Sequence, residues 1–136
     1  MKILIICSKA FYHKIPPIKE KLEKMGHTIS LPNSYDCPNA EKESWDLGKE
    51  EHAKFKERMF HQSKDTIEKM DAVLTLNFEK HGQANYIGGA TFLELYEAFM
   101  MHKKIYLYNP IPQGILYDEI SGFSPIIING NIELIK

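Results

Sequence analysis

Cysteine is scarce in this chain, and its scarcity excludes two classes of small protein. Only two cysteines, Cys7 and Cys37, occur among the 136 residues. Two thiols cannot build the disulfide framework of a small secreted domain or a four-ligand zinc site made of cysteines. Cys7 ends an apolar run, so we expect a buried free thiol there. The sequence predicts neither a metal ion nor a cofactor.

Long hydrophobic runs and an excess of one charge are also missing. The opening apolar run, residues 3–6, is far shorter than the ~18–20 apolar residues of a membrane span, and it is shorter than a signal-peptide core. The 17 basic and 18 acidic residues give a formal net charge of -1, which disfavours a nucleic-acid duplex as partner. We therefore expect a cytoplasmic protein that binds neither a membrane nor a duplex.

No glycine-rich phosphate fingerprint comes after the first apolar run, because neither G-x-G-x-x-G nor a Walker pattern occurs there. The run leads instead into a short basic loop with Ser8, Lys9, His13 and Lys14. Free N–H groups at the start of the next helix, together with these side chains, could hold a small anion. A solvated basic loop without a ligand is the other interpretation, and the sequence leaves both open.

The chain does contain a clear alternation of strand and helix patterns. Residues 1–7 are a β-branched run typical of a strand buried on both faces. Residues 16–25 begin with two prolines and end before a glycine, which predicts a short helix. Residues 27–31 predict a second strand. A strand, a helix and a strand within about thirty residues form a βαβ unit with a right-handed crossover.

The rest of the chain continues this alternation. Residues 32–44 predict a loop and residues 45–70 a long helix, whose start Gly48 is expected to break or delay. The remaining predicted elements are strands at 71–77, 104–109 and 124–129 and a helix at about 90–102. We therefore predict one α/β domain over residues 1–136, with a flavodoxin-like or Rossmann-like doubly wound sheet of five parallel strands in the order 2-1-3-4-5.

This topology predicts where a ligand should bind. Open parallel sheets bind ligands beyond the carboxyl ends of their strands, at the switch point between strands 1 and 3. Three segments should converge there: residues 8–14, 77–94 and 109–117.

The sharpest local feature is a glycine pair followed by a carboxylate. Gly88 and Gly89 allow a sharp turn and a close backbone approach to a ligand, and Glu94 should lie near the first turn of the next helix. The positive end of the helix dipole would favour an ionised carboxylate, as a nucleophile requires. An ordinary first-turn glutamate fits the same pattern, and Glu97, one turn further on, is a rival carboxylate.

Three stretches resemble the nucleoside 2-deoxyribosyltransferase superfamily, which includes the 2'-deoxynucleoside 5'-phosphate N-hydrolases. They are residues 70–77 (MDAVLTLN), 86–95 (YIGGATFLEL) with Ala98, and 103–110 (KKIYLYNP). The resemblance runs in order from the first predicted strand to the fifth, over nearly the whole chain. It implies that Glu94 is the nucleophile and that the substrate is a small nucleoside or nucleotide. The residues then expected to bind the substrate are Ser8, Lys9, Asn77, Tyr86, Gly88, Gly89, Thr91 and Asn109.

The chemistry that the resemblance implies is a double displacement at the anomeric carbon. The glutamate attacks C1' as the nucleobase leaves, and a second base or water then releases the sugar, as in retaining glycoside hydrolysis. The resemblance also implies a homodimer or a higher assembly.

Two positions depart from the family pattern. Family members commonly carry an Asp eight residues before the Asp that opens the third strand, and here that position is Ser63. A serine cannot be the acid for a departing base at neutral pH. If Ser63 replaces that Asp, its hydroxyl should face the sheet or the mouth of the pocket. The family's glycine before the first-loop serine is Cys7 here.

These departures leave more than one function open. The first hypothesis is an enzyme that cleaves or transfers the N-glycosidic bond of nucleosides or nucleoside 5'-monophosphates. The second is a nucleotide-binding module on the same fold with little or no turnover. A receiver or electron-carrier domain is a weaker third, because the chain lacks paired early acidic residues and a Ser/Thr/Gly-rich flavin phosphate loop.

Overall fold

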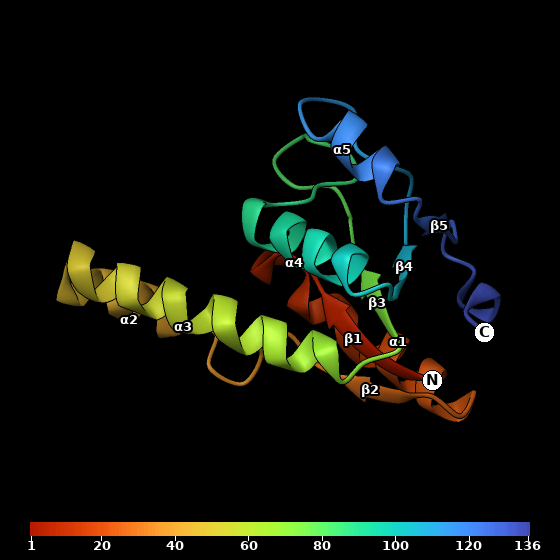
Figure 1. The fold of residues 1–136 in the computed structure, drawn as a ribbon, viewed down its shortest axis with the longest axis horizontal. Coiled ribbons are helices and arrows are strands. Elements are labelled where there is room, and N and C mark those ends of the chain that lie inside the picture. The colour runs from red at the N-terminus through yellow and green to blue at the C-terminus, as the bar shows by residue number, and fades with distance from the viewer.

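Five parallel strands form one sheet at the centre of the computed structural model, which describes residues 1–136. The strand order is β2-β1-β3-β4-β5, so the predicted flavodoxin-like doubly wound topology is confirmed (Figure 1). Every neighbouring pair of strands is parallel. The strands are β1 (Lys2–Ile6), β2 (Thr28–Ser30), β3 (Ala72–Thr75), β4 (Lys104–Leu107) and β5 (Ile126–Ile127).

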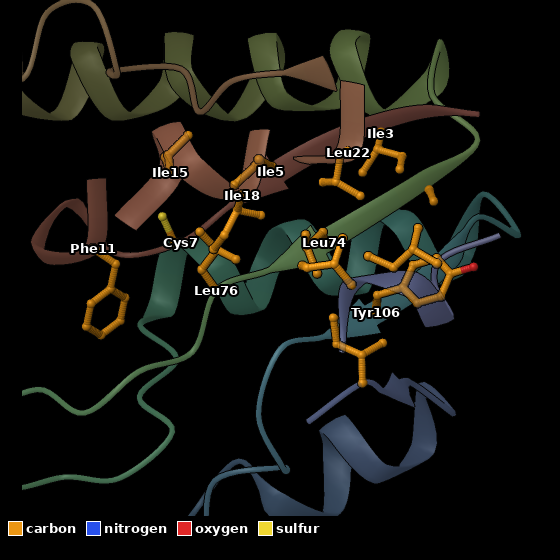
Figure 2. Close-up of a cluster of buried hydrophobic side chains, with 14 residues drawn as sticks. Ile3, Ile5, Cys7, Phe11, Ile15, Ile18, Leu22, Leu74, Leu76 and Tyr106 are labelled. Atoms are coloured by element: carbon orange, nitrogen blue, oxygen red, sulfur yellow. The ribbon is translucent and has the colours of Figure 1, made fainter. Parts of the chain in front are cut away.

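One face of the sheet is covered by helix α1 (Ile15–Lys24) and the C-terminal 3-10 helix η2 (Ile132–Leu134). Figure 2 shows Ile15, Ile18 and Leu22 of α1 gathered against strands β1 and β3. The β1 residues on this face are Ile3 and Ile5, which are fully buried. Because side chains alternate along a strand, their neighbours point to the opposite face.

The opposite face is covered by α3 (Lys49–Glu68), α4 (Gly89–Met100) and α5 (Tyr117–Gly122). Leu4 and Ile6 of β1 pack there against Ile67 of α3 and Leu95 of α4. A strand buried on both faces explains why residues 1–7 form a continuous apolar run. No helix has the combination of length and apolar character that a bilayer crossing needs.

The helix predicted over residues 45–70 breaks at Gly48, as expected. Gly48, with φ 121° and ψ 168°, separates α2 (Ala40–Leu47) from α3. A side chain is strained at this φ, so a glycine is the residue that can make the turn. α2 begins inside the stretch predicted as a loop, and the α2–α3 hairpin extends beyond the sheet (Figure 1).

Two further short elements lie outside the predicted helices and strands. The 3-10 helix η1 (Lys9–Lys14) comes after β1, and its N-cap Ser8 accepts a hydrogen bond from the amide of Ala10 at 3.4 Å. α5 comes after β4, and its six residues are too few to show a helical period in the sequence.

Candidate functional site

A cleft of about 430 Å³ lies beyond the carboxyl ends of β1, β2 and β3. Its walls come from the segment after β1, the loop after β2, the inner side of α3 and the start of α4. The cleft therefore lies at the predicted switch point between β1 and β3. Seven of the predicted site residues line it: Ser8, Lys9, Tyr86, Gly88, Gly89, Thr91 and Glu94.

Asn77 and Asn109 do not line the cleft, so the prediction that they share a pocket with Ser8 is wrong. The Asn77 side chain is fully buried and donates to the carbonyls of Asn109 and Pro110 at 2.9 and 3.0 Å. In return, the backbone N–H of Asn109 donates to Asn77 Oδ1 at 2.8 Å, and the side-chain Nδ2 of Asn109 donates to the backbone carbonyl of Asn77 at 3.0 Å. These four bonds clamp the ends of β3 and β4 together. Residues 109–117 accordingly contribute nothing to the cleft wall.

Glu94 lies deeper in its helix than the sequence suggested. α4 begins at Gly89, so Glu94 is its sixth residue, in the second turn, and no acidic residue occupies the first turn. The helix dipole acts most strongly on the first turn, which weakens that reason for an ionised carboxylate. The start of the helix, at Gly88 and Gly89, instead has backbone N–H groups without a side-chain cap.

The pKa of Glu94 is raised from its ordinary value of 4.5 to about 7. Burial is the main cause, because a carboxylate surrounded by protein loses its hydration. A hydrogen bond from Ser63 and the positive charge of Lys56 both lower the pKa, and together they offset only part of the burial effect. The expectation of a carboxylate kept ionised by its helix is therefore wrong: at neutral pH, Glu94 is divided between its two protonation states.

Ser63 faces the cleft, as predicted. It is 8% exposed, and its Oγ donates to Glu94 Oε2 at 3.2 Å. The serine thus touches the carboxylate across the α3–α4 boundary, at the position where the resemblance places an Asp. The only other carboxyl group on the cleft wall is that of Glu41 at the exposed mouth, 3.7 Å from Lys56 Nζ.

Two site residues that the sequence reasoning missed are Asn33 and Lys80. Asn33 comes after β2, and its side chain donates to Ser63 Oγ at 2.7 Å. Lys80 comes after β3 and donates to Ser8 Oγ at 3.1 Å, while its ammonium lies 4.7 Å from the centre of the Tyr86 ring. Both residues stand just after strand ends, so the strand-end rule that selects Asn77 could have found them. The composition of residues 32–44, however, indicates only a loop.

The two glycines play different structural roles. A Cβ on Gly88 would lie 3.2 Å from the Tyr86 hydroxyl oxygen, so this position allows the ring to approach the backbone. Gly89 has nothing within 4 Å of its would-be Cβ and faces open space at the start of α4. The predicted close approach therefore applies to Gly88, and Gly89 leaves room beside the helix N-terminus.

The part of the cleft wall formed by α3 and η1 is largely apolar and aromatic. It includes Phe55, Met59 and Phe60 of α3 and Tyr12 of η1. Burial raises the pKa of Tyr12 above its usual range, and the charge of Glu94 adds to the effect. Cys7 is a buried free thiol, as predicted, and burial followed by the effect of Glu94 raises its pKa to about 12. Both groups stay protonated at neutral pH.

A second hollow, of about 520 Å³, lies between α3 and the edge of β2. Met70 is its only hydrophobic lining residue, and the others include Arg58, His61 and Asp65. Its one carboxyl group, that of Asp65, is exposed, and the glycine pair does not line it. No group of three or more His, Cys, Asp or Glu side chains is arranged to hold a metal ion.

Comparison with known proteins adds little to this geometry. No family model matches the chain, and no curated protein matches its sequence. Among solved structures, the chain is similar to FerB, a flavoenzyme NAD(P)H:(acceptor) oxidoreductase from Paracoccus denitrificans, at 14% sequence identity and a TM-score of 0.45. The similarity covers 93% of this chain and 74% of FerB. At such values it carries no argument about function.

Proposed function

We propose that this protein cleaves or transfers the N-glycosidic bond of nucleosides or nucleoside 5'-monophosphates, with Glu94 as the nucleophile. The observation that carries the proposal is a partly ionised carboxylate, bonded to Ser63, inside a cleft with one apolar wall and one cationic end. The resemblance of residues 70–110 to the nucleoside 2-deoxyribosyltransferase superfamily supports the same assignment.

The reaction proceeds by two displacements at C1'. An oxygen of the Glu94 carboxylate bonds to C1', the C1'–N bond breaks, and its electron pair leaves with the base, which takes up a proton from solvent water. Water or a second base then bonds to C1' and loses a proton to the solvent, while the bond between Glu94 and C1' breaks and the carboxylate is released. The first step needs ionised Glu94, so the rate should rise with pH through about 7, the pKa of this group.

The two ends of the cleft fit the two ends of a nucleotide. Aromatic and thioether side chains such as Phe55, Phe60 and Met59 offer a surface against which a base can stack. Lys9, Lys80 and the uncapped start of α4 offer positive charge and free N–H groups for an anion. A 5'-monophosphate is therefore favoured over the free nucleoside.

Release of free base tests this function. The protein is incubated with ribo- and deoxyribonucleosides and their 5'-monophosphates, with and without a second base as acceptor, and the products are separated by chromatography. We expect base release from at least one 5'-monophosphate and slower release from its nucleoside. Absence of base release from every compound would overturn the proposal.

A specific observation favours one alternative, a nucleotide-binding module with little turnover. The side chain next to Glu94 is a serine, which cannot protonate a leaving base. The remaining cleft carboxyl group, that of Glu41, lies at the exposed mouth beside Lys56. Saturable binding of a monophosphate in calorimetry without release of base would select this alternative.

We also propose that the protein acts as a homodimer. The outer side of α4 exposes Leu93, Tyr96 and Met100, which are 46%, 49% and 59% exposed and lie three to four residues apart on one stripe. A second copy would cover this stripe next to the site. Light scattering that gives a strictly 15.8 kDa particle at micromolar concentration would contradict the dimer.

A further inference from the structure

Asn33 lies half-buried in the loop after β2, and its amide is fixed by two acceptors on α3. Its Nδ2 donates to the carbonyl of Met59 at 3.2 Å and to Ser63 Oγ at 2.7 Å. A backbone carbonyl can only accept hydrogen bonds, so the nitrogen of the Asn33 amide, not its oxygen, must face α3. The amide orientation then dictates that Ser63 accepts from Asn33.

The Ser63 hydroxyl has one hydrogen, and two acceptors compete for it. A serine inside a helix commonly donates to the carbonyl four residues earlier, which here belongs to Met59. Asn33 donates to that same carbonyl and also to the serine oxygen. With Asn33 in place, the hydroxyl hydrogen is free for Glu94 Oε2, 3.2 Å away.

We propose that Asn33 is a positioning residue: by bonding both Met59 and Ser63, it holds the Ser63 hydroxyl as a donor to the Glu94 carboxylate. The Asn33–Ser63–Glu94 chain links the loop after β2, helix α3 and helix α4. Its consequence for turnover rests on the proposed function, whereas its effect on the carboxylate does not.

The surroundings of Glu94 explain why this donor matters. Lys56 of α3 lowers the pKa of Glu94, while burial raises it. The neighbouring ionisable groups Cys7 after β1, Tyr12 of η1 and Glu41 of α2 offer no positive charge. Two further lysines, Lys9 and Lys80, line the cleft but are not among the groups that shift the pKa of Glu94. The Ser63 hydroxyl is therefore one of only two influences that favour the ionised form.

The test measures the titration of Glu94 directly. The carboxyl carbon of Glu94 is followed by ¹³C NMR over acidic to mildly basic pH in the wild type, Asn33→Ala, Ser63→Ala and the double variant. We expect Asn33→Ala to raise the pKa of Glu94 by about one, since the serine turns to Met59 and a charge-assisted hydrogen bond is lost. Ser63→Ala should raise it by a similar amount. In the double variant the rise should equal that of Ser63→Ala alone.

Asn39→Ala is the matched control, because Asn39 belongs to the same connection, is exposed and makes no side-chain cap bond. It should leave the Glu94 titration unchanged. The proposal is overturned if Asn33→Ala leaves the pKa of Glu94 unchanged, or if it shifts that pKa equally with and without Ser63. Because the NMR titration needs no turnover, an inactive protein would contradict the proposed function and leave this result intact.

A second variant keeps the test available if Asn33→Ala does not fold, as judged by circular dichroism. Asn33→Asp has nearly the same volume and cannot donate. Its added charge raises the pKa of Glu94 both in the wild type and in Ser63→Ala. The loss of the Ser63 donor adds to this rise only in the wild type, where Ser63 is present. Equal shifts in the two backgrounds would overturn the proposal.

Discussion

The carboxyl edge of the sheet contains two polar regions that solve the problem of burial in opposite ways. At the ends of β3 and β4, Asn77 and Asn109 share three hydrogen bonds, and Asn77 donates a fourth to the carbonyl of Pro110, all at 2.8–3.0 Å. Both hydrogens of the buried Asn77 side-chain amide are used in this way. At the ends of β1 and β2, Glu94 is held by one side-chain bond and opens into the cleft.

The difference distinguishes polar groups that only stabilise the fold from a polar group that remains available to a substrate. The buried Asn77 amide uses both of its hydrogens and its oxygen, so it stabilises the strand ends and has no side-chain donor left for a ligand. A carboxylate with one hydrogen-bond donor and a raised pKa keeps unused acceptor capacity, at a cost in stability. Two kinds of polar residue at one edge of the sheet thus have different roles.

The largest expected effect comes from removing the charge of Glu94, which opens into the cleft. Glu94→Gln keeps the volume and the bond from Ser63 but cannot form a bond to C1'. We expect base release to fall by at least ~10³-fold, as is typical when a covalent nucleophile is removed. The chromatographic assay measures this loss, and near-wild-type turnover in the variant would remove Glu94 from the mechanism.

A gain of activity should result from adding an acid beside Glu94. Ser63→Asp places a second carboxyl group where Ser63 touches Glu94, and the two would share a proton available to the leaving base. We expect base release to rise roughly 10–100-fold below about pH 7, part of the ~10²–10⁴ that general acids supply. Ser63→Asn, of nearly equal volume, is the control and should give no gain. An unchanged rate in Ser63→Asp would favour another acid or the binding module.

A change at the Asn77–Asn109 clamp should instead lower the stability of the fold. Asn77→Ala removes three side-chain hydrogen bonds from a fully buried site and leaves their backbone partners without a hydrogen bond from this side chain. We expect a loss of about 2–4 kcal/mol in the free energy of unfolding, measured in urea. Asn39→Ala, on the surface, should cost less than about 0.5 kcal/mol. A similar small effect for Asn77→Ala would show that the clamp is dispensable.

The smallest expected effect concerns the stability that is lost by burying the ionised Glu94 carboxylate, and this loss depends on pH. The pKa of Glu94 is about 7 when folded and near 4.5 when unfolded, so between these values the folded state binds more protons. This group's contribution to stability therefore falls as pH rises from 4.5 to about 7. Glu94→Gln should be more stable than the wild type at about pH 8, by roughly 1–3 kcal/mol, and lose this advantage near about pH 4.5. A difference that does not vary with pH would contradict the raised pKa.

Much of the fold could be predicted because its signals are local. The apolar run before Ser8 predicts β1 and the glycine pair at the start of α4 predicts that helix, each within a few residues, and the alternation of such signals predicts the strand order. The break at Gly48 could be expected from the glycine, but helix α2 before it was missed, because residues 32–44 have the composition of a loop. Short elements such as η1 and α5 have too few residues to show a period.

The candidate site could be predicted only in part, because its chemistry depends on contacts between distant segments. The sequence by itself determined the parallel sheet, the edge at which the cleft opens and the presence of Glu94 beside two glycines. The tertiary structure alone decided that Asn33 and Glu94, 30 and 31 residues from Ser63 in the chain, both bond to it, and that Asn77 turns away to Asn109. It also decided the protonation of Glu94, since the pKa of a carboxyl group depends on the desolvation, charges and donors assembled around it.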